Sequence, residues 1–562
     1  MSRKLTIAAM AVVAVLGLMG TSMAADHQLN LYGASAQFAF WNTAAKPFLT
    51  GTKGCTVTST ALSTDLKNGV TQGSSCTGGD TYTIRYSSKA SYDGILALNT
   101  PAPQTRYQGS AYAAPCHGGD ALCGGGSLAG LSTQTYWNYR TMLCDTTSNA
   151  TTNIKCVKVD VGASDVAASS FEESSSGCLK GANTTGWPSA CTGANFVTRT
   201  FNGIDTTSAA YNANGPLAAF NPMIVPFGIY ANNAVSITKC LAPDPTTPDY
   251  ATAGTYDPTK DKAVSAWGNQ CYDPSNSGHS QDCVGYYKCI SNACVGGVNK
   301  GQHCYSINEC PDVALSATKC ERVPIDNVSR LMLTMIYSGS ALNWQDFGVW
   351  YQGAVPTTGA DPIIACVRHA GSGTAATFHI MMKGNGWGVP EAAFPTAQST
   401  GGPNYQFSDG TADMMKCVAG YDLTHTLGQN IGAIGYADCD VLMATPFSNP
   451  TSGTLNYPYE LVHQLKLDGI ECKAAKVRDG EYPFYTIEWM YYDPTNTEAS
   501  LISDLATFAG NGLNYASIAF TNGPNSQGSE GDFWDSEGEM NYLKSSDFSW
   551  PTIVGGNGDR LP

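Results

Sequence analysis

The chain has 562 residues, with 45 acidic against 30 basic side chains and a formal net charge of −15. This length exceeds the usual size of one domain, so we expect more than one. The negative charge argues against nucleic acid and anionic membranes as partners, because both would repel the chain. A site for a small anion would therefore have to act through local dipoles and nearby side chains.

The first 24 residues are typical of a signal peptide. Arg3 and Lys4 precede an apolar run from Ile7 to Met19, and residues 22–24 fit a small-x-small cleavage site. The apolar run is shorter than the ~20 residues of a membrane-spanning helix, and no cysteine near the cleavage site offers a lipid anchor. We therefore predict an exported protein, periplasmic or secreted, with no membrane span and no lipid anchor.

The 20 cysteines all follow the predicted cleavage site. Their even number and the export signal favour disulfides over metal ligation. They form three groups within which pairing is possible, and the sequence leaves the pairing open. The groups are eight cysteines from Cys55 to Cys191, eight from Cys240 to Cys320, and four from Cys366 to Cys472.

The first part of the mature chain alternates between strand-like and helix-like runs. Apolar patterns predict strands at residues 29–32, 82–86 and 157–161, and helices at residues 37–48 and 91–98. This alternation predicts an α/β fold with a mainly parallel sheet. Ligands of such sheets bind beyond the carboxyl ends of the strands.

The second part continues the alternation. Residues 362–367 and 432–436 are predicted as strands, residues 375–382 and 497–509 as helices, and residues 482–492 as one long aromatic strand.

Helical spacing also predicts a helix at residues 326–338. Val328, Leu331, Met332 and Met335 share one face of it. We expect this apolar face to lie in the core rather than to bind a partner.

Three segments do not fit the alternation. Residues of about 101–156 and 239–322 are predicted as insertions, and the second holds seven cysteines from Cys271 to Cys320, as in disulfide-stapled surface units. The tail from residue 511 to 562 is polar and rich in glycine. Its acidic run at 529–539 does not have the spacing of an EF-hand loop, so we predict a solvated acidic loop rather than a calcium site.

Residues 368–374, with the sequence RHAGSGT, join a predicted strand to a predicted helix. The first amides of a helix have no internal partners and lie at the positive end of its dipole, so such a turn can hold an anion. Arg368 would add a two-pronged positive group. The same stretch is compatible with an ordinary turn and a helix cap at Ser372 or Thr374, so it does not decide the function alone.

Sequence motifs of common enzyme classes are missing. The chain has no GxSxG nucleophile elbow, no HExxH zinc pair and no GxxxxGK[ST] phosphate loop. His369 lies beside the glycine-rich turn, and we expect a supporting or surface role for it rather than catalysis. We therefore predict a binding protein that is not an enzyme, with no cofactor and no metal.

Seven segments in a fixed order resemble the periplasmic phosphate-binding proteins of Pst-type ABC importers, which belong to the type 2 periplasmic-binding-protein superfamily. The segments are YGASAQF at 32–38, YSSKASYDGI at 86–95, VDVGASD at 159–165, NPMIVPFGIYANN at 221–233, IDNVSRLMLTMIYSGSALNW at 325–344, ACVRHAGSGTAATF at 365–378 and GAIGYAD at 432–438. The resemblance implies two α/β lobes joined by crossover strands, with an anion bound between them. It also implies delivery of inorganic phosphate to the membrane subunits of an ABC importer, by closure of the lobes and without chemistry on the ligand.

On this resemblance, lobe I comprises residues 25–225 and the return segment and tail 484–562, and lobe II comprises residues 226–483. The family's ligand contacts fall on eight positions, which are Ala36, Gln37, Ser91, Asp165, Arg368, Ser372, Gly373 and Thr374. Ala36 and Gln37 lie on the loop that offers backbone amides to the anion.

Asp165 would distinguish phosphate from sulfate. Phosphate keeps at least one proton near neutral pH and can donate it to a carboxylate, whereas fully ionised sulfate has none to give. Without the resemblance, Asp165 would be interpreted as the N-cap of a following helix.

The chain departs from the family pattern at three places. Gln37 stands where a threonine is usual, Tyr92 and Asp93 interrupt the family's GSSGG loop, and Ala370 stands where an aspartate often pairs with the arginine. These departures and the insertions leave a second hypothesis open, an extracellular structural or interaction protein built on the same scaffold. A secreted phosphatase is the third. The choice among phosphate, arsenate and other oxyanions also stays open.

Overall fold

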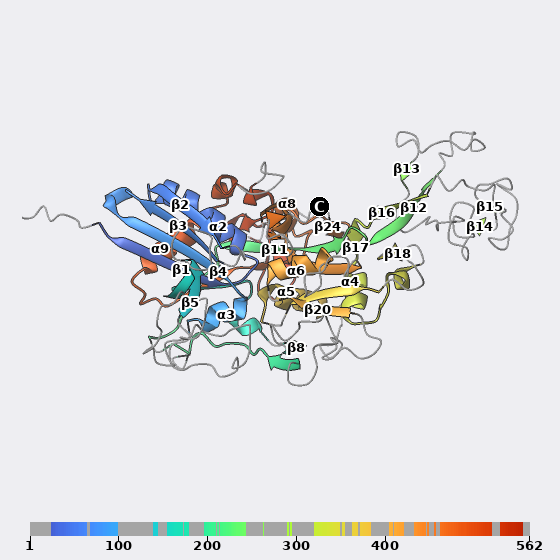
Figure 1. Cartoon of the computed structure of the whole chain (residues 1–562), viewed down its shortest axis with the longest axis horizontal. Helices are drawn as coiled ribbons and strands as arrows, with labels where there is room; N and C mark the ends of the chain where they lie inside the picture. Colours follow the sequence, from blue (N-terminus) through green and yellow to red (C-terminus); the bar gives the residue numbers. More distant parts are fainter. Residues whose placement is uncertain are drawn as a thin grey trace, which may run out of the picture.

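The computed structural model describes most of the predicted mature chain (Figure 1). The described residues are 24–63, 68–98, 139–143, 154–171, 174–178, 196–208, 211–212, 214–242, 262–263, 289–290, 293–294, 320–348, 351–353, 362–368, 371–383, 404–408, 410–420, 432–444, 447–448, 455–456, 461–519 and 529–554. The predicted signal peptide up to residue 23, most of both predicted insertions, His369 and Ala370 lie outside them. Within these ranges, no helix has the length and apolar character needed to cross a membrane.

A seven-stranded mixed sheet forms the first lobe. Its strands in spatial order are β10 (Ala218–Phe220), β26 (Trp489–Tyr492), β7 (Val161–Ser164), β1 (Asp26–Gly33), β4 (Thr81–Ser88), β3 (Asn68–Ser74) and β2 (Thr56–Leu62). The central strands β7, β1 and β4 run parallel, with Leu31 of β1 opposite Val161 on one side and Tyr86 on the other. Their carboxyl ends therefore meet at one edge of the sheet.

The second lobe is built on an eight-stranded mixed sheet, to which the return segment 484–562 contributes two short strands. Its main strands in order are β17 (Asn327–Val328), β24 (Val462–Leu467), β11 (Met223–Asn232), β21 (Ala433–Asp438), β19 (Ile364–Arg368) and β20 (Asn404–Ser408), and β25 (Tyr485–Ile487) and β27 (Asp535–Ser536) also pair with β11. Strand β19 runs parallel to both of its neighbours, β20 and β21. The carboxyl ends of these three strands also lie at one edge.

Helices are short and follow the strands. They are α2 (Phe38–Pro47), α3 (Ser91–Leu96), α4 (Arg330–Tyr337), α5 (Gly373–Lys383), α6 (Thr411–Val418), α7 (Val441–Ala444), α8 (Ala474–Arg478) and α9 (Ala499–Ala509). Figure 1 shows α4, α5 and α6 gathered beside the second sheet, and the blue strands of the first sheet on the other side of the molecule.

Smaller strand groups complete the described structure. A third sheet contains β13 (Lys262–Ala263), β12 (Ser236–Ala242), β16 (Cys320–Pro324) and β18 (Tyr351–Gln352). The two-stranded pairs are β5 (Tyr139–Leu143) with β6 (Ile154–Lys158), β8 (Ser174–Cys178) with β9 (Phe196–Thr200), β14 (Cys289–Ile290) with β15 (Ala293–Cys294), β22 (Phe447–Ser448) with β23 (Leu455–Asn456), and β28 (Tyr542–Lys544) with β29 (Pro551–Ile553). In Figure 1, β12 and β16 extend away from the second sheet toward the right.

The chain passes between the two sheets over very short connections. Only Asn221 and Pro222 separate β10 of the first sheet from β11 of the second. On the return, only Glu488 separates β25, which pairs with β11, from β26 in the first sheet. The predicted two-lobed α/β architecture is confirmed, but both sheets are mixed rather than mainly parallel.

The core extends over both sheets. Phe378 of α5 stacks on Tyr436 of β21 with ring centroids 4.2 Å apart. Phe40 of α2 packs at 5.0 Å on Trp534 and at 5.5 Å on Tyr515, both from the C-terminal segment. The C-terminal segment is therefore part of the core and not an appended tail.

Three disulfides lie among the described residues. Cys55 bonds to Cys76, Cys366 to Cys417, and Cys439 to Cys472. Each pair stays within one of the groups predicted from the sequence, and the four cysteines of the last group pair entirely with one another. These disulfides are typical of a protein outside the cytoplasm.

Two predicted strands are wrong in extent. Residues 157–161 do not form one strand, because β6 ends at Lys158 and β7 begins at Val161 and continues to Ser164. Residues 482–492 form two strands in place of one, and Glu488 separates them. The aromatic pattern continues across this point although the hydrogen-bonding partners change.

The predicted helix at 326–338 begins later than expected, because Ser329 caps it by accepting a hydrogen bond from the Met332 amide. Val328 and Met332 are buried, but Leu331 is 66% exposed, so the predicted core face is wrong at that residue. The predicted solvated acidic loop is also wrong in part, because Glu530 and Asp535 are buried. Asp535 pairs there with Arg478, at 2.8 and 2.9 Å.

Candidate functional site

Three loops of the first sheet converge at the carboxyl ends of its parallel strands. Gln37 follows β1, Ser91 follows β4 and Asp165 follows β7. The Gln37 side-chain amide donates to Asp165 Oδ1 at 2.9 Å, and the Ser91 hydroxyl donates to Asp165 Oδ2 at 3.2 Å. Ala36 precedes Gln37 on the same loop and is buried. The parallel register thus brings together residues far apart in the sequence.

The turn after β19 brings the second sheet to the same place. Thr374 Oγ1 donates to Asp165 Oδ2 at 3.5 Å, and the Gly373 amide donates to Ser91 Oγ at 3.1 Å. Arg368, at the end of β19, lies near enough for its charge to act on Asp165. Ser372 caps α5, because its hydroxyl accepts a hydrogen bond from the Ala375 amide at 3.3 Å.

All eight predicted site residues are therefore in one region, and each is at most 2% exposed where its exposure is known. Ser372 caps α5 and also belongs to the turn that contributes to the site. The two interpretations of this turn, a helix cap and a part of the site, therefore hold together. Asp165 does not cap a helix, because β7 is followed there by a bend and a short 3-10 turn. Its carboxylate accepts from side chains of both lobes.

Gly373 lies in close contact with the first lobe. A Cβ atom at this position would lie 2.3 Å from Ser91 Oγ and 2.7 Å from Asp165 Cβ. These distances are shorter than van der Waals contact allows, so only glycine fits against the first lobe here.

Asp165 has an unusual acidity. Burial raises the pKa of its carboxyl group from 3.8 to about 6, although hydrogen bonds from Gln37 and Ser91 and the charge of Arg368 act in the opposite direction. The group is therefore mainly ionised at pH 7 and titrates just below neutrality. A buried carboxylate beside an arginine can accept a proton from a ligand and still tolerate a negative charge nearby.

Several residues that connect to the site were not predicted from the sequence. Ser35 of the first lobe and Thr411 at the start of α6 share a hydrogen bond of 3.2 Å between their hydroxyl groups. Trp41 and Glu488 extend the contacts of Gln37 toward the connection between the sheets. Neither Thr411 nor Glu488 belongs to a recognisable motif, and only the fold reveals their position.

Tyr92, one of the departures from the family pattern, is completely buried within the first lobe. Its ring packs against Phe171 and Phe201 at 4.9 and 5.2 Å, and its hydroxyl donates to the Asn202 carbonyl at 3.1 Å. The substitution therefore serves core packing.

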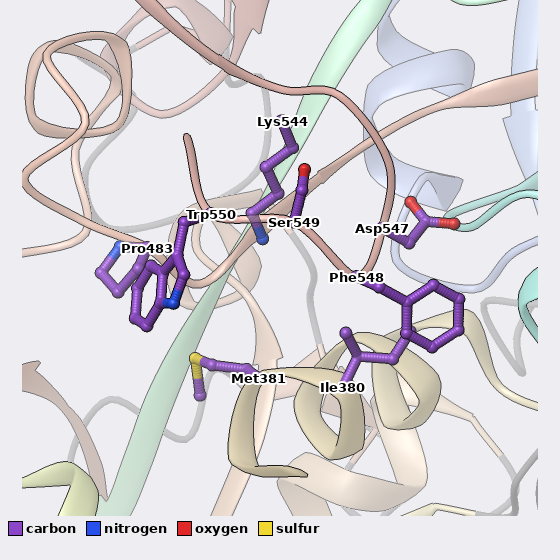
Figure 2. Close-up of a pocket in the computed structure, with 8 residues that line it drawn as sticks. All are labelled: Ile380, Met381, Pro483, Lys544, Asp547, Phe548, Ser549 and Trp550. Carbon is purple, nitrogen blue, oxygen red and sulfur yellow. The ribbon is translucent and has the colours of Figure 1, made fainter. Parts of the chain in front are cut away.

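A separate pocket lies beside the far end of α5 (Figure 2). Its lining residues are Ile380, Met381, Pro483, Lys544, Asp547, Phe548, Ser549 and Trp550. Its volume of about 20 Å³ is room for about one water molecule. Burial lowers the pKa of Lys544 to about 8, and its ammonium donates to the Tyr485 carbonyl at 2.6 Å.

Asp547 connects this pocket to the candidate site. Its carboxylate accepts from the Ala167 amide at 2.8 Å, from the Ser170 hydroxyl at 2.6 Å and from the Thr486 hydroxyl at 3.1 Å. The C-terminal segment thus fixes the backbone two residues beyond Asp165.

The arrangement combines hydroxyl and amide donors with one arginine and one carboxylate. Such a set can surround a small tetrahedral anion, and the carboxylate requires that the anion carry a proton. Among the described residues, no group of three or more His, Cys, Asp or Glu side chains is arranged to hold a metal ion.

Comparison with known protein families finds a match over the part of the chain that contributes Arg368, Ser372, Gly373 and Thr374 to this site. Residues 314–510 match the model of a PBP superfamily domain, a segment that includes β19, α5 and the connection at Glu488. No curated protein matches the chain.

Solved structures of substrate-binding proteins resemble it at low identity. A putative phosphate ABC transporter substrate-binding protein with bound phosphate from Clostridium perfringens is 12% identical, with 86% of this chain and 93% of that chain covered and a TM-score of 0.33. The phosphate binding protein from Stenotrophomonas maltophilia is 10% identical, with 86% and 82% covered and a TM-score of 0.32. An ABC-type phosphate transport receptor from Vibrio cholerae is 13% identical, with 51% and 66% covered and a TM-score of 0.23.

Because these TM-scores are low, the solved structures carry no argument here. The relationship to the PBP superfamily depends on the family model and on the two connected sheets. Residues 314–510 of the chain thus match a PBP superfamily domain, and the two connected mixed sheets are consistent with the two-lobed fold of type 2 periplasmic-binding proteins.

Proposed function

We propose that the chain is an exported substrate-binding protein that holds inorganic phosphate between its lobes and delivers it to the membrane subunits of an ABC importer. The proposal includes the lobe boundaries expected from the sequence, with residues 25–225 and 484–562 in lobe I and residues 226–483 in lobe II. The ligand is bound and released without chemistry.

One observation carries the proposal: Asp165 accepts hydrogen bonds from Gln37 and Ser91 of one lobe and from Thr374 of the other. Arg368 supplies positive charge at the same place. A buried carboxylate in an anion site favours a ligand that carries a proton, which hydrogen phosphate does and sulfate does not. The ligand would compete for donors that now bond to Asp165 and Ser91.

The test is isothermal titration of the mature, oxidised protein with phosphate and, separately, with sulfate at pH 7. We expect heat of binding with phosphate and none with sulfate. In Arg368→Ala, phosphate binding should be lost while the circular dichroism spectrum stays that of the wild type, because the guanidinium is the cation of the site. Wild-type affinity in this variant would refute the site.

A structural or interaction protein on the same scaffold is the second candidate. The observation in its favour is that the polar groups of the site satisfy one another, with Gly373 packed against Ser91 and Asp165. If the wild-type protein bound neither anion, this second candidate would take precedence.

A further inference from the structure

A buried row of side chains extends from Asp165 to the connection between the sheets at Glu488. The Gln37 amide donates to Asp165 Oδ1 at 2.9 Å, and its carbonyl oxygen accepts from the Trp41 indole at 3.1 Å. The same indole donates to Glu488 Oε1 at 3.0 Å. We call Gln37, Trp41 and Glu488 the Gln37 network.

The Gln37 network is isolated from water. Gln37 and Glu488 are 0% exposed and Trp41 is 2% exposed. Hydrogen bonds in such surroundings restrict side-chain orientation strongly, because a broken bond cannot be replaced by water.

Glu488 occupies a special place in the chain. It is the single residue between β25 and β26, where the chain returns from the second sheet to the first. Its backbone is held on both sides, since its amide donates to the Met223 carbonyl at 3.0 Å and its carbonyl accepts from Asn221 Nδ2 at 2.6 Å. Asn221 lies in the other connection between the sheets, and Met223 is the first residue after it.

The surroundings of Glu488 favour its protonated, neutral form. Burial raises its pKa well above 4.5, the Trp41 hydrogen bond acts in the opposite direction, and the charge of Asp165 raises the pKa further. Its Oε2 atom is buried without a hydrogen-bond partner, as fits a neutral carboxyl group rather than a charged one. Tyr86 and Tyr515 are further titratable groups close enough to interact electrostatically with Glu488.

We propose that Gln37 is a positioning residue which, supported by Trp41 and Glu488, orients the Asp165 carboxylate and thereby sets the preference for protonated over fully ionised oxyanions. This inference rests on the proposed function. The Gln37 amide donates to one oxygen of Asp165 and so restricts rotation of the carboxylate. The carboxylate therefore cannot turn aside to relieve repulsion by an anion that lacks a proton. A threonine at position 37 would be too short to join Asp165 to Trp41.

The test compares Gln37→Met with Gln464→Met. Methionine keeps the length of glutamine but neither donates to Asp165 nor accepts from Trp41. Gln464 is the control, because its side-chain amide likewise donates one hydrogen bond to a side-chain oxygen, Tyr230 Oη at 3.0 Å, but within the second sheet and partly exposed. We expect Gln37→Met to reduce the ratio of phosphate to sulfate affinity about tenfold, the effect of losing one hydrogen bond to a charged group, and Gln464→Met to leave it unchanged. An unchanged ratio in Gln37→Met would overturn the inference.

Glu488 is tested by a conservative pair. Glu488→Gln keeps an oxygen that accepts from Trp41, whereas Glu488→Leu does not. We expect a larger loss of anion preference in Glu488→Leu than in Glu488→Gln. Equal losses in the two variants would mean that the charge of Glu488 matters, which contradicts a neutral network.

A measurement without ligand separates this inference from the proposed function. Titration of the Asp165 carboxyl carbon by carbon-13 NMR, assigned with Asp165→Asn, should give a pKa of about 6 in the wild type and a higher value in Gln37→Met. Gln464→Met should match the wild type. If the wild type bound no anion, the proposed function would fail, but the titration would still decide whether Gln37 controls Asp165, and equal pKa values in all three proteins would refute it.

Discussion

Gly373 allows the most direct test of the contact between the lobes. Alanine there would place its Cβ 2.3 Å from Ser91 Oγ, so the turn after β19 must move away from the first lobe. We expect Gly373→Ala to lower the free energy of unfolding by about 1–3 kcal/mol, as overpacking does, and to weaken phosphate binding. Thermal unfolding and calorimetric titration measure the two effects.

Gly538→Ala is the matched control for this substitution. A Cβ at Gly538 would meet no atom within 4 Å, and its backbone does not require glycine. We expect a change of less than about 0.5 kcal/mol and unaltered binding. Equal behaviour of the two alanine variants would contradict the close approach at Gly373.

Asp165→Asn tests the carboxylate itself. Asparagine has the same shape but offers an amide donor where Asp165 offers an acceptor, so a fully ionised anion would no longer be repelled. We expect phosphate affinity to fall about tenfold or more and sulfate binding to become measurable by calorimetry. Sulfate that stays silent while phosphate binds as in the wild type would show that Asp165 does not select the ligand.

Residues of the site were predictable to different degrees. Asp165, Arg368 and Thr374 follow strands in recognisable order, and the structure brings them together. Trp41 and Glu488 lie in no motif, because their importance arises only where a helix of one lobe meets the connection between the sheets. Long-range contacts of this kind have no local sequence pattern.

At the scale of elements, the disulfide between Cys366 and Cys417 joins β19 to α6, across 51 residues of sequence. Replacing both cysteines by alanine removes a constraint on the unfolded chain. We expect the free energy of unfolding to fall by about 4 kcal/mol on the chain-entropy model. Denaturant unfolding under oxidising conditions measures it.

The Cys55–Cys76 disulfide offers the comparison, because it closes only 21 residues and lies in the first lobe. On the same model its removal costs about 3 kcal/mol, and it should leave the turn after β19 undisturbed. If neither double variant shifted the denaturation midpoint, the disulfides would not constrain the unfolded protein as expected.

The predicted strands and helices agree best with the structure where one apolar pattern belongs to one element with one set of hydrogen-bonding partners. The strand predicted at 29–32 lies within β1, and α9 forms the helix predicted at 497–509 except for its first two residues. Residues 482–492 were misjudged because periodicity records which side chains are apolar, and not which neighbouring strand accepts the backbone hydrogen bonds. A change of sheet at Glu488 leaves the aromatic pattern intact.

For the whole molecule, buried acidic groups determine how stability depends on pH. Burial, followed by the charge of Asp440, raises the pKa of Asp438 well above 3.8, and burial likewise raises the pKa of Glu530 well above 4.5. Burial also raises the pKa of Glu488 and brings that of Asp165 to about 6. The folded protein therefore keeps protons that the unfolded chain releases above about pH 4.

This difference fixes the sign of the pH dependence. Because the folded state binds more protons, its stability is highest in mild acid and falls as the pH rises through the raised pKa values. Each proton held only by the folded state lowers stability by about 1.4 kcal/mol per pH unit in that range. We expect the melting temperature, measured by calorimetry at constant ionic strength, to decrease from pH 5 to pH 8.

Glu530→Gln and Glu471→Gln separate the buried groups from the surface. Glutamine at position 530 removes a buried group with a raised pKa, so the fall in melting temperature with pH should become shallower. Glu471 has a pKa lowered by its hydrogen bond to Lys473 and lies at the surface, so its replacement should leave that fall unreduced. A melting temperature that rose toward pH 8 in the wild type would mean that these carboxyl groups are already ionised in the folded protein at pH 5, which contradicts their raised pKa values.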